Sequence, residues 1–153
     1  MLNSYNHIFI IPCSKKKIWT KGHIGPIEAK DAYISTYFRL CKEYVNKFLK
    51  KWFILSGKYG IISPDFIIME DYDVKLKASK KFKEKVIKQA ESIISEDPIE
   101  FVVSLCGDVY SNFLKEVFYP LGVGVKTPLK GMRIGERQRL LKSSLETGEE
   151  LAL

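Results

Sequence analysis

Small, polar and basic residues follow each of four short apolar runs in the sequence. Residues 13–17 (CSKKK) follow the first run and residues 56–60 (SGKYG) the second, while residues 106–108 (CGD) and 126–128 (KTP) follow the third and fourth. Lysine ammonium groups and free backbone N–H groups bind anions, and glycine lets the backbone approach a ligand closely. Any α/β protein needs turns at such points, but four turns of this composition predict a ligand site.

Several of these residues are suited to acid–base or covalent chemistry. Lys15 and Lys17 are candidates for holding a phosphate group or for acting as a nucleophile. Asp73, or Asp65 on the same connection, is the candidate general base, or the carboxylate that stabilises an oxocarbenium-like centre. Tyr59 is a candidate platform for stacking a base. The other candidates for ligand contact are Cys13, Ser14, Ser56, Gly57, Lys58, Gly107 and Tyr110.

Structural roles are also open to these residue types. Aspartate is well suited to turns, and buried tyrosines commonly pack in cores. Arg133 and Arg137 lie four residues apart, which places them on one face of a helix as a further candidate anion site. A solvated basic helix face is the alternative for this pair.

Known phosphate-binding motifs do not match the sequence. Gly57-Lys58 is followed by Tyr59 and lacks the upstream glycine of a P-loop, and no GxGxxG follows the first apolar run. The sequence therefore argues against an ordinary Walker ATPase and a Rossmann dehydrogenase.

The cysteines and histidines give no metal or disulfide signature. Cys13, Cys41 and Cys106 contain no CxxC pair, which argues against a disulfide framework and a zinc ribbon. Cys13 and Cys106 close two strands that we expect to be neighbours, so they are expected to face one pocket, either as reactive thiols or as inert packing. We expect Cys41 to pack in the core. No cofactor is expected, and a metal held by carboxylates alone would leave no spacing signature.

Strand and helix patterns alternate along the chain. Apolar, β-branched runs predict strands at residues 8–11, 52–55, 101–105 and 123–125, the last of them at a sheet edge. Helical spacing predicts helices from Gly25-Pro26 to about Leu49, over about 17 residues from Ala78 to a stop at Asp97-Pro98, after a cap at Asp108, and from about Met132 to Leu145 before a fraying tail. Residues 61–77 are expected to form a long irregular excursion.

This alternation predicts a single α/β domain over residues 1–153. The expected fold is a three-layer α/β/α sandwich whose mainly parallel sheet has about four strands. Because the carboxyl ends of parallel strands meet in one crevice, the residues that follow the strands are expected to form one site.

The net charge of +7 and the pI near 9.2 favour anionic partners, nucleic acid first. Solvated lysines on helix faces are the alternative reason for this charge. No stretch approaches the ~20 apolar residues of a membrane span. The N-terminal residues lack a signal-peptide pattern, so a cytoplasmic location is expected.

The same motifs resemble an uncharacterised α/β family of small bacterial, archaeal and phage proteins (DUF6884-like). That family typically reads CSKxK, then LSAKYGLL with a following proline, then YD and a leucine. Here residues 12–16 read PCSKK, residues 54–62 read ILSGKYGII before Pro64-Asp65, and Tyr72-Asp73 and Leu76 follow. Residues 106–110 and 128–131 continue the similarity, which extends to about residue 140. Gly57 stands where the family usually has alanine.

Two better-known groups are more distantly similar. The YaaA-type peroxide-stress proteins carry a similar LSGLYG block and are associated with DNA binding and protection under oxidative stress. The α/β domain of archaeosine synthase, a tRNA-modifying relative of the guanine transglycosylases, carries PCSxxKPYS. Residues 12–17 match that motif up to Lys17, and Ile18-Trp19 replace its Pro-Tyr. This domain is similar in kind to uracil-DNA glycosylases, so the resemblances imply nucleobases.

The sequence therefore favours a protein that binds a nucleobase, nucleotide or nucleic acid at the strand ends. The expected reaction is modification of a base or nucleoside, as in a glycosidase or transglycosylase. Two other functions remain open. One is a non-catalytic, stress-related DNA- or RNA-binding protein that uses its basic surface, and the other is a small-molecule enzyme unrelated to nucleic acid. The sequence does not establish catalysis or oligomeric state.

Overall fold

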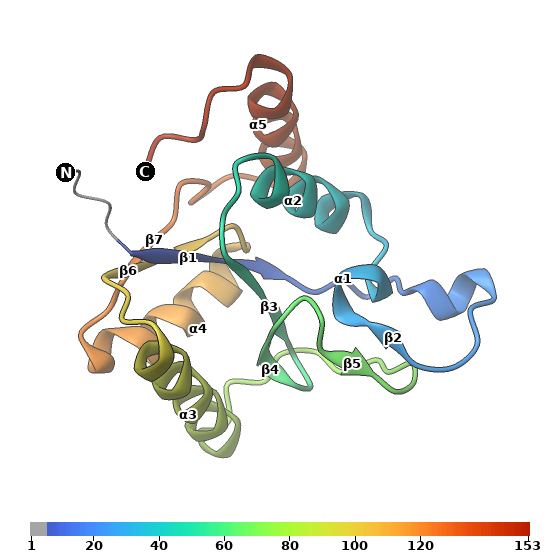
Figure 1. Cartoon of the computed structure of the whole chain (residues 1–153), viewed down its shortest axis with the longest axis horizontal. Helices are drawn as coiled ribbons and strands as arrows, with labels where there is room; N and C mark the ends of the chain where they lie inside the picture. Colours follow the sequence, from blue (N-terminus) through green and yellow to red (C-terminus); the bar gives the residue numbers. More distant parts are fainter. Residues whose placement is uncertain (1–5) are drawn as a thin grey trace.

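A five-stranded sheet in the order β4-β3-β1-β6-β7 forms the centre of the molecule (Figure 1). The strands are β1 His7–Pro12, β3 Trp52–Ser56, β4 Gly60–Ile62, β6 Phe101–Ser104 and β7 Gly124–Lys126. β1, β3, β6 and β7 run parallel, and only β4, at one edge, pairs antiparallel to its neighbour. The mainly parallel sheet is confirmed, with one strand more than expected and with β7 at the other edge.

Helices cover both faces of this sheet in the computed structural model, which describes residues 6–153. The pair α2 (Thr36–Lys47) and α5 (Ile134–Thr147) lies on one face, and the pair α3 (Lys80–Glu96) and α4 (Asp108–Phe118) lies on the other (Figure 1). The predicted three-layer α/β/α sandwich is therefore confirmed. The expectation about the N-terminal signal pattern falls mainly on residues 1–5, which lie outside the described residues.

Alternate side chains of β1 build the two cores of the sandwich. Phe9 and Ile11 belong to the core beneath α2 and α5, and Ile8 and Ile10 belong to the core above α3 and α4. Successive side chains of a strand point to opposite faces, so a continuous apolar run fills both layers. This burial fixes β1 in the middle of the sheet and sets where its carboxyl end, and the residues that follow, must lie.

The single helix predicted from Gly25-Pro26 to about Leu49 is wrong in its first half. The chain instead forms β2 (Ile27–Glu28) and the one-turn helix α1 (Ala29–Ala32), and α2 begins only after Ser35, whose hydroxyl accepts a hydrogen bond from the Phe38 N–H at 3.1 Å. β2 pairs with β5 (Ile67–Ile68), so the backbone of residues 27–28 is used in a second, two-stranded sheet. Long-range pairing has overridden the helical spacing.

Residues 61–77 contain more regular structure than expected. β5 and all of β4 except Gly60 lie in this stretch. The short helix η1 (Ile18–Lys21) precedes β2, the strand with which β5 pairs. Gln89 of α3 holds the turn between β3 and β4, because its Oε1 accepts from the Ile61 N–H at 2.8 Å and its Nε2 donates to the Tyr59 carbonyl at 2.8 Å. Irregular backbone is thus confined mainly to the segment that approaches α3.

Helix boundaries agree with the expectations in most places. α3 has 17 residues, begins after the capping hydroxyl of Ser79 and ends at Asp97. The cap of α4 is Gly107 and not Asp108, since Asp108 is the first helical residue and its carboxylate accepts from the Gly131 N–H at 3.2 Å. A short helix, η2 (Tyr119–Leu121), follows α4.

The C-terminal tail does not fray. The Leu151 N–H donates to the Tyr44 hydroxyl at 2.9 Å, and Lys50 Nζ lies 2.6 Å from Glu150 Oε1. The expectation of a frayed end is wrong because Leu151 packs against the core beneath α2 and α5. Within residues 6–153, no helix combines the length and the apolar character that crossing a bilayer requires.

Candidate functional site

Three segments converge where the central strands end. They are the loop after β1, the segment that follows β5 and the beginning of α4 after β6. β1 has β3 on one side and β6 on the other, and the chain fills the β3 side first before crossing to the β6 side. The carboxyl end of β1 is therefore a topological switch point, the place where open α/β sheets bind their ligands.

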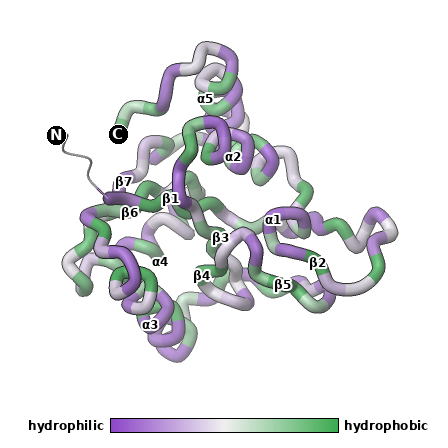
Figure 2. Tube along the Cα trace, viewed as in Figure 1, coloured by the Kyte–Doolittle hydropathy of each residue, from purple (hydrophilic) through white to green (hydrophobic). Residues whose placement is uncertain are grey.

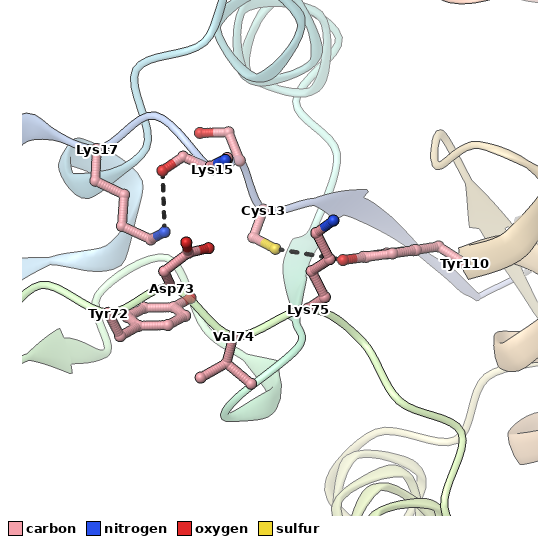
Figure 3. A pocket seen from close by; sticks show the side chains of 9 residues that line it. Cys13, Lys15, Lys17, Tyr72, Asp73, Val74, Lys75 and Tyr110 are labelled. Carbon is pink, nitrogen blue, oxygen red and sulfur yellow. Dashed lines mark hydrogen bonds between the residues drawn. The ribbon is translucent and has the colours of Figure 1, made fainter.

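A cavity of about 90 Å³ lies at this point (Figure 3). Nine residues line it: Cys13, Ser14, Lys15, Lys17, Tyr72, Asp73, Val74, Lys75 and Tyr110. Six of these residues, all except Tyr72, Val74 and Lys75, are candidates from the sequence. Complete small-molecule sites usually measure roughly 300–1,000 Å³. The cavity therefore admits one small polar group, and the rest of any larger ligand must lie outside it.

Lys17 is the buried cation of this site. Lys17 is only 2% exposed, and its Nζ donates to the Lys15 carbonyl at 3.1 Å. The same nitrogen lies 4.3 Å from the centroid of the Tyr72 ring. No carboxylate in residues 6–153 forms an ion pair with Lys17 within 4.0 Å. A lysine held this way is an unneutralised charge facing the cavity.

Burial lowers the pKa of Lys17 below its ordinary value, against the opposing attraction of Cys13, Asp71 and Asp73. Desolvation disfavours the charged ammonium, so more of this amine is neutral near pH 7 than for an exposed lysine. The backbone position is fixed by an isolated antiparallel bridge between Lys17 and Tyr33. That bridge turns the residue back over the end of β1.

Three hydroxyl groups form a chain beneath Lys17. Ser56 Oγ accepts from the N–H groups of Lys58 and Tyr59 at 3.2 and 3.1 Å, so its own proton is donated to the Tyr72 hydroxyl at 2.9 Å. The Tyr72 hydroxyl also hydrogen-bonds the Tyr33 hydroxyl. Hydrogen bonds thus link the hydroxyl groups of Ser56, Tyr72 and Tyr33.

These tyrosines stay protonated at neutral pH. Burial raises the pKa of Tyr72 to about 12, and burial together with the neighbouring Tyr72 raises the pKa of Tyr33 above its ordinary value. Both hydroxyls are therefore neutral donors, and the Tyr72 ring presents its face to the Lys17 ammonium. Such an arrangement stabilises a cation by electrostatics without neutralising it.

Asp73 and Lys75 bring opposite charges to the rim of the cavity. Figure 3 shows the Asp73 carboxylate on the side of Lys17 and the Lys75 side chain on the side of Cys13 and Tyr110. Gly57 lies beneath this segment, because a Cβ at that position would stand 2.6 Å from Leu76 N and from Val74 O. Glycine at position 57 is thus what allows residues 74–76 to cross so close to the loop after β3.

The two cysteines expected to share one pocket are separated. Cys13 lines the cavity, with its Sγ 3.9 Å from the Tyr110 hydroxyl, whereas Cys106 is buried and its Sγ faces the Ile10 carbonyl at 3.7 Å. Burial raises the pKa of Cys106 to about 12, so this thiol is unreactive at neutral pH. Cys41 is buried in the other core, in agreement with the packing expected for it.

Lys58 and Tyr59, in the loop after β3, contact the Tyr72 ring. Lys58 Nζ lies 5.4 Å from the centroid of the Tyr72 ring. Tyr59 packs edge-on against Tyr72 at 5.2 Å and against Phe66 at 5.1 Å, and it does not line the cavity. Tyr59 therefore acts on the site through the orientation of Tyr72.

Four further candidates, Asp65, Gly107, Arg133 and Arg137, lie neither in the cavity lining nor in the loop after β3. Asp65 is exposed and accepts from the Ser63 hydroxyl at 2.6 Å in a turn. The Arg137 guanidinium lies 4.8 Å from the Tyr37 ring centroid and packs over Gly107. Arg133 is exposed just before α5, so the two arginines have different surroundings.

Sequence reasoning missed Lys75, Val74 and the contribution of Tyr33. Lys75 and Val74 directly follow the Tyr72-Asp73 motif, and this adjacency was the available signal. Tyr33 gave none, because it was assigned to a continuous helix. Within residues 6–153, no group of three or more histidine, cysteine, aspartate or glutamate side chains is arranged to hold a metal ion.

Comparisons with known proteins agree with this fold. The chain is 46% identical over 66 residues to the uncharacterized protein YfjM of Bacillus subtilis (strain 168), a match that covers 42% of this chain and 44% of that protein. The structure is similar to the crystal structure of AF0587, a protein of unknown function, with a TM-score of 0.50, 12% identity and coverage of 97% of this chain and 46% of that one. The match thus covers less than half the length of either protein.

The family comparison covers most of the chain. The profile of the family of unknown function DUF6884 matches residues 8–143. This range contains the whole central sheet except His7, the first residue of β1, and it contains every residue that lines the cavity. The matched range also includes the CSKKK, SGKYG and YD segments whose side chains meet at the end of β1. The chain belongs to the DUF6884 family.

Proposed function

We propose that this protein binds one nucleotide unit at the cavity and modifies it, with Lys17 acting as an amine nucleophile. The observation that carries the proposal is Lys17, which is buried at a switch point, has no ion-pair partner among residues 6–153 and has a lowered pKa. A lysine amine whose pKa is lowered by desolvation is suited to covalent catalysis. A lysine with a merely structural role would be expected to have a carboxylate partner or to extend into water.

The reaction that best fits these groups is attack at the sugar C1′ of a nucleoside. The amine forms a bond to C1′ while the bond from C1′ to the base breaks, as in a glycosidase or transglycosylase. The base leaves with the electron pair of that bond and takes up a proton from water. Asp73, close enough to interact electrostatically with Lys17, receives the proton of the amine or stabilises the positive charge that develops on the sugar. Tyr72 and Tyr33 supply the neutral hydroxyl donor.

The other cations of the cavity are suited to a phosphate group. Lys15 and Lys75 are exposed, line the rim and form no ion pair with a carboxylate within 4.0 Å in residues 6–153. Lysine binds phosphate as a point charge that needs no fixed geometry. In the proposed complex the phosphate lies at the rim, and the atom under attack faces Lys17.

The more distant resemblances support the same substrate class. The match of residues 12–17 to the PCSxxK motif of archaeosine synthase puts its lysine at Lys17, the one lysine that is buried in the cavity. The resemblance to the YaaA-type proteins supports a link to DNA. All three cysteines are free thiols, which supports a cytoplasmic location.

A thermal-shift screen tests this proposal. Purified protein is heated with nucleobases, nucleosides and nucleotides at low and moderate salt. A ligand at 100 times its dissociation constant adds about 2.7 kcal/mol to the free energy of unfolding. We expect stabilisation by a nucleoside or nucleotide to persist in salt, to be lost in Lys17→Ala and to remain in Lys16→Ala, because Lys16 is exposed and does not line the cavity.

Asp73→Asn separates binding, measured in the same screen, from catalysis, measured as release of the free base. Because the amide keeps the size of the carboxylate but loses its charge, the ligand should still stabilise this variant while product formation falls by about 10²-fold or more. Equal stabilisation of the wild type and Lys17→Ala by every active ligand would refute the proposed site. Stabilisation by polyanions alone, vanishing with salt, would leave a non-catalytic binding protein.

A further inference from the structure

The positive charge of the chain is concentrated beside the cavity. Residues 74–88 hold seven lysines and one glutamate, which gives them a net charge of +6 when the whole chain carries +7. Of these lysines only Lys83 forms an ion pair within the described residues, with Glu116 at 2.8 Å. Hydrophilic residues dominate the outward turns of α3 (Figure 2). The charge is therefore a local feature and not an even coating of the surface.

The first turn of α3 carries positive charges, which are unfavourable at the amino end of a helix. Its first residues read KKFK, and its first turn contains no acidic residue. The amino end of a helix already bears a partial positive charge, so lysines at this end weaken the helix while acidic residues would strengthen it. Lys80 and Lys81 are exposed, and neither has an ion-pair partner among residues 6–153. An external anion would offset this cost.

A second cavity connects the cavity of Lys17 to these lysines. It has a volume of about 270 Å³ and is lined by Gly57, Lys58, Val74, Lys75, Lys77, Ser79 and Phe82. Val74 and Lys75 line both cavities, so the two share one wall. Lys85 of α3 donates to the Lys58 carbonyl at 3.4 Å, which holds the helix beside the loop after β3. Lys58, Lys75 and Lys77 thus line one cavity beside that of Lys17, and Lys80, Lys81 and Lys85 follow on α3.

We propose that Lys58, Lys75, Lys77, Lys80, Lys81 and Lys85 form a lysine track that binds the phosphate backbone of a single-stranded nucleic acid. This inference rests on the proposed function, because the strand delivers one nucleotide to the cavity of Lys17. It names the substrate as a polymer and not a free nucleotide.

An unpaired strand fits this surface better than a duplex does. The cavity at the end of β1 measures about 90 Å³, and a nucleotide of a duplex must leave the base stack before its sugar can reach a site of this kind. The second cavity places the half-buried Phe82 ring and Val74 among the lysines. Proteins that bind single strands combine a cationic groove with apolar or aromatic surfaces against which bases lie.

Fluorescence anisotropy with labelled single strands of about 15 nucleotides tests the track, with DNA and RNA strands in separate arms. The triple variant Lys77→Glu, Lys80→Glu, Lys81→Glu should bind either strand at least about tenfold more weakly than the wild type. It should also show a flatter salt dependence, because each phosphate contact on a single strand contributes about 0.7 to the slope of log K against log salt. The arm that binds more tightly identifies the sugar.

The matched control is Lys21→Glu, Lys47→Glu, Lys142→Glu, which makes the same change in net charge. These lysines are exposed on η1, α2 and α5 and line neither cavity. Affinity within about twofold of the wild type is expected for the control. An equal loss in both triple variants, equal affinity for a duplex of the same sequence, or equal affinity for a poly-glutamate peptide would overturn the proposal.

The outcomes separate this inference from the function on which it rests. If single nucleotides stabilise the protein through Lys17 but the triple variant binds strands as tightly as the wild type, the track is refuted and the nucleotide site stands. If strands bind through the track but no nucleotide stabilises the protein, the modifying site is refuted while strand binding stands. Circular dichroism of both triple variants checks that the lost affinity does not come from unfolding of α3.

Discussion

The chemistry of the site depends on single side chains whose surroundings differ from water. Lys17 is buried beside the Tyr72 ring, and burial lowers the pKa of its amine. Tyr33 and Tyr72 are buried beside it, and their pKa values are raised. The same desolvation therefore pushes an amine and two phenols toward their neutral forms, and this combination suits a nucleophile with a neutral hydrogen-bond donor.

Lys17→Met tests the burial of the amine through its pH dependence. In the folded protein the pKa of Lys17 is lowered from 10.5, so between the lowered value and 10.5 the unfolded chain binds a proton that the folded chain does not. Stability of the wild type relative to Lys17→Met should therefore rise with pH over this window. Urea denaturation of both proteins from neutral pH to about pH 10 measures the difference, and a difference independent of pH would contradict the lowered pKa.

Tyr72→Phe tests the hydroxyl chain. Removal of this hydroxyl leaves the buried Tyr33 hydroxyl without its partner, and we expect a loss of about 1–3 kcal/mol in the free energy of unfolding. The double variant with Tyr33→Phe should cost less than the two single changes together. Tyr119→Phe is the control, because Tyr119 is 54% exposed and should change stability by less than about 0.5 kcal/mol. Additive losses would contradict a shared hydrogen-bond chain.

At the scale of elements, the site depends on two loops and one crossing segment. The loop after β1 supplies Lys17, the loop after β3 supports Tyr72, and residues 74–76 cross over Gly57. Gln89 of α3 fixes the turn between β3 and β4 from the other side. The position of the crossing segment is therefore set by close backbone contacts and not by regular secondary structure.

Gly57→Ala tests this crossing. The new methyl group would lie 2.6 Å from backbone atoms of Val74 and Leu76, which cannot move as a flexible side chain can. We expect a loss of about 1–3 kcal/mol in stability and a loss of ligand-induced stabilisation. Gly135→Ala is the matched control, because a Cβ at that position in α5 meets nothing within 4 Å and should raise stability by about 0.5–1 kcal/mol. Equal stability of Gly57→Ala and the wild type would show that residues 74–76 lie elsewhere.

The central elements could be predicted from sequence because their patterns are local. The apolar runs beginning at Ile8 and Trp52 fill both cores, and α3 has a capping serine at Ser79 and a stop at Asp97. β2 and β5 could not be predicted, because each has only two residues and forms a strand by pairing with the other, about 40 positions away. The same pairing explains why residues 25–49 are not one helix.

The lining of the site was predicted where it directly follows a strand. Cys13 and Lys17 follow β1, and their place at a switch point follows from the parallel sheet. Tyr33 reaches the site through a bridge to Lys17, a tertiary contact without a sequence signature. Lys75 lies on the crossing segment, and its adjacency to Tyr72-Asp73 was its one sequence signal. Cys106 was misplaced because its side chain points to the opposite face of the sheet.

At the scale of the whole molecule, the C-terminal tail stabilises the layer of α2 and α5. Leu151 packs on this core and donates to Tyr44, and Glu150 pairs with Lys50. Deletion of residues 149–153 should lower the free energy of unfolding by about 1–2 kcal/mol through lost apolar burial and an unpaired hydroxyl. The cavity lies away from these contacts, so ligand-induced stabilisation should persist. Unchanged stability on denaturation in urea would contradict the packing of the tail.

Selective trapping of the Lys17 amine tests the central claim most directly. Pyridoxal 5′-phosphate combines an aldehyde with a phosphate; the amine attacks the aldehyde, water leaves, and borohydride reduces the imine to a stable adduct that peptide mapping locates. At neutral pH we predict preferential labelling of Lys17 over exposed lysines such as Lys16, and protection by a mixture of ribo- and deoxyribonucleoside monophosphates. Labelling of Lys16 as fast as Lys17, or labelling that nucleotides leave unchanged, would contradict a nucleophilic lysine in a nucleotide site.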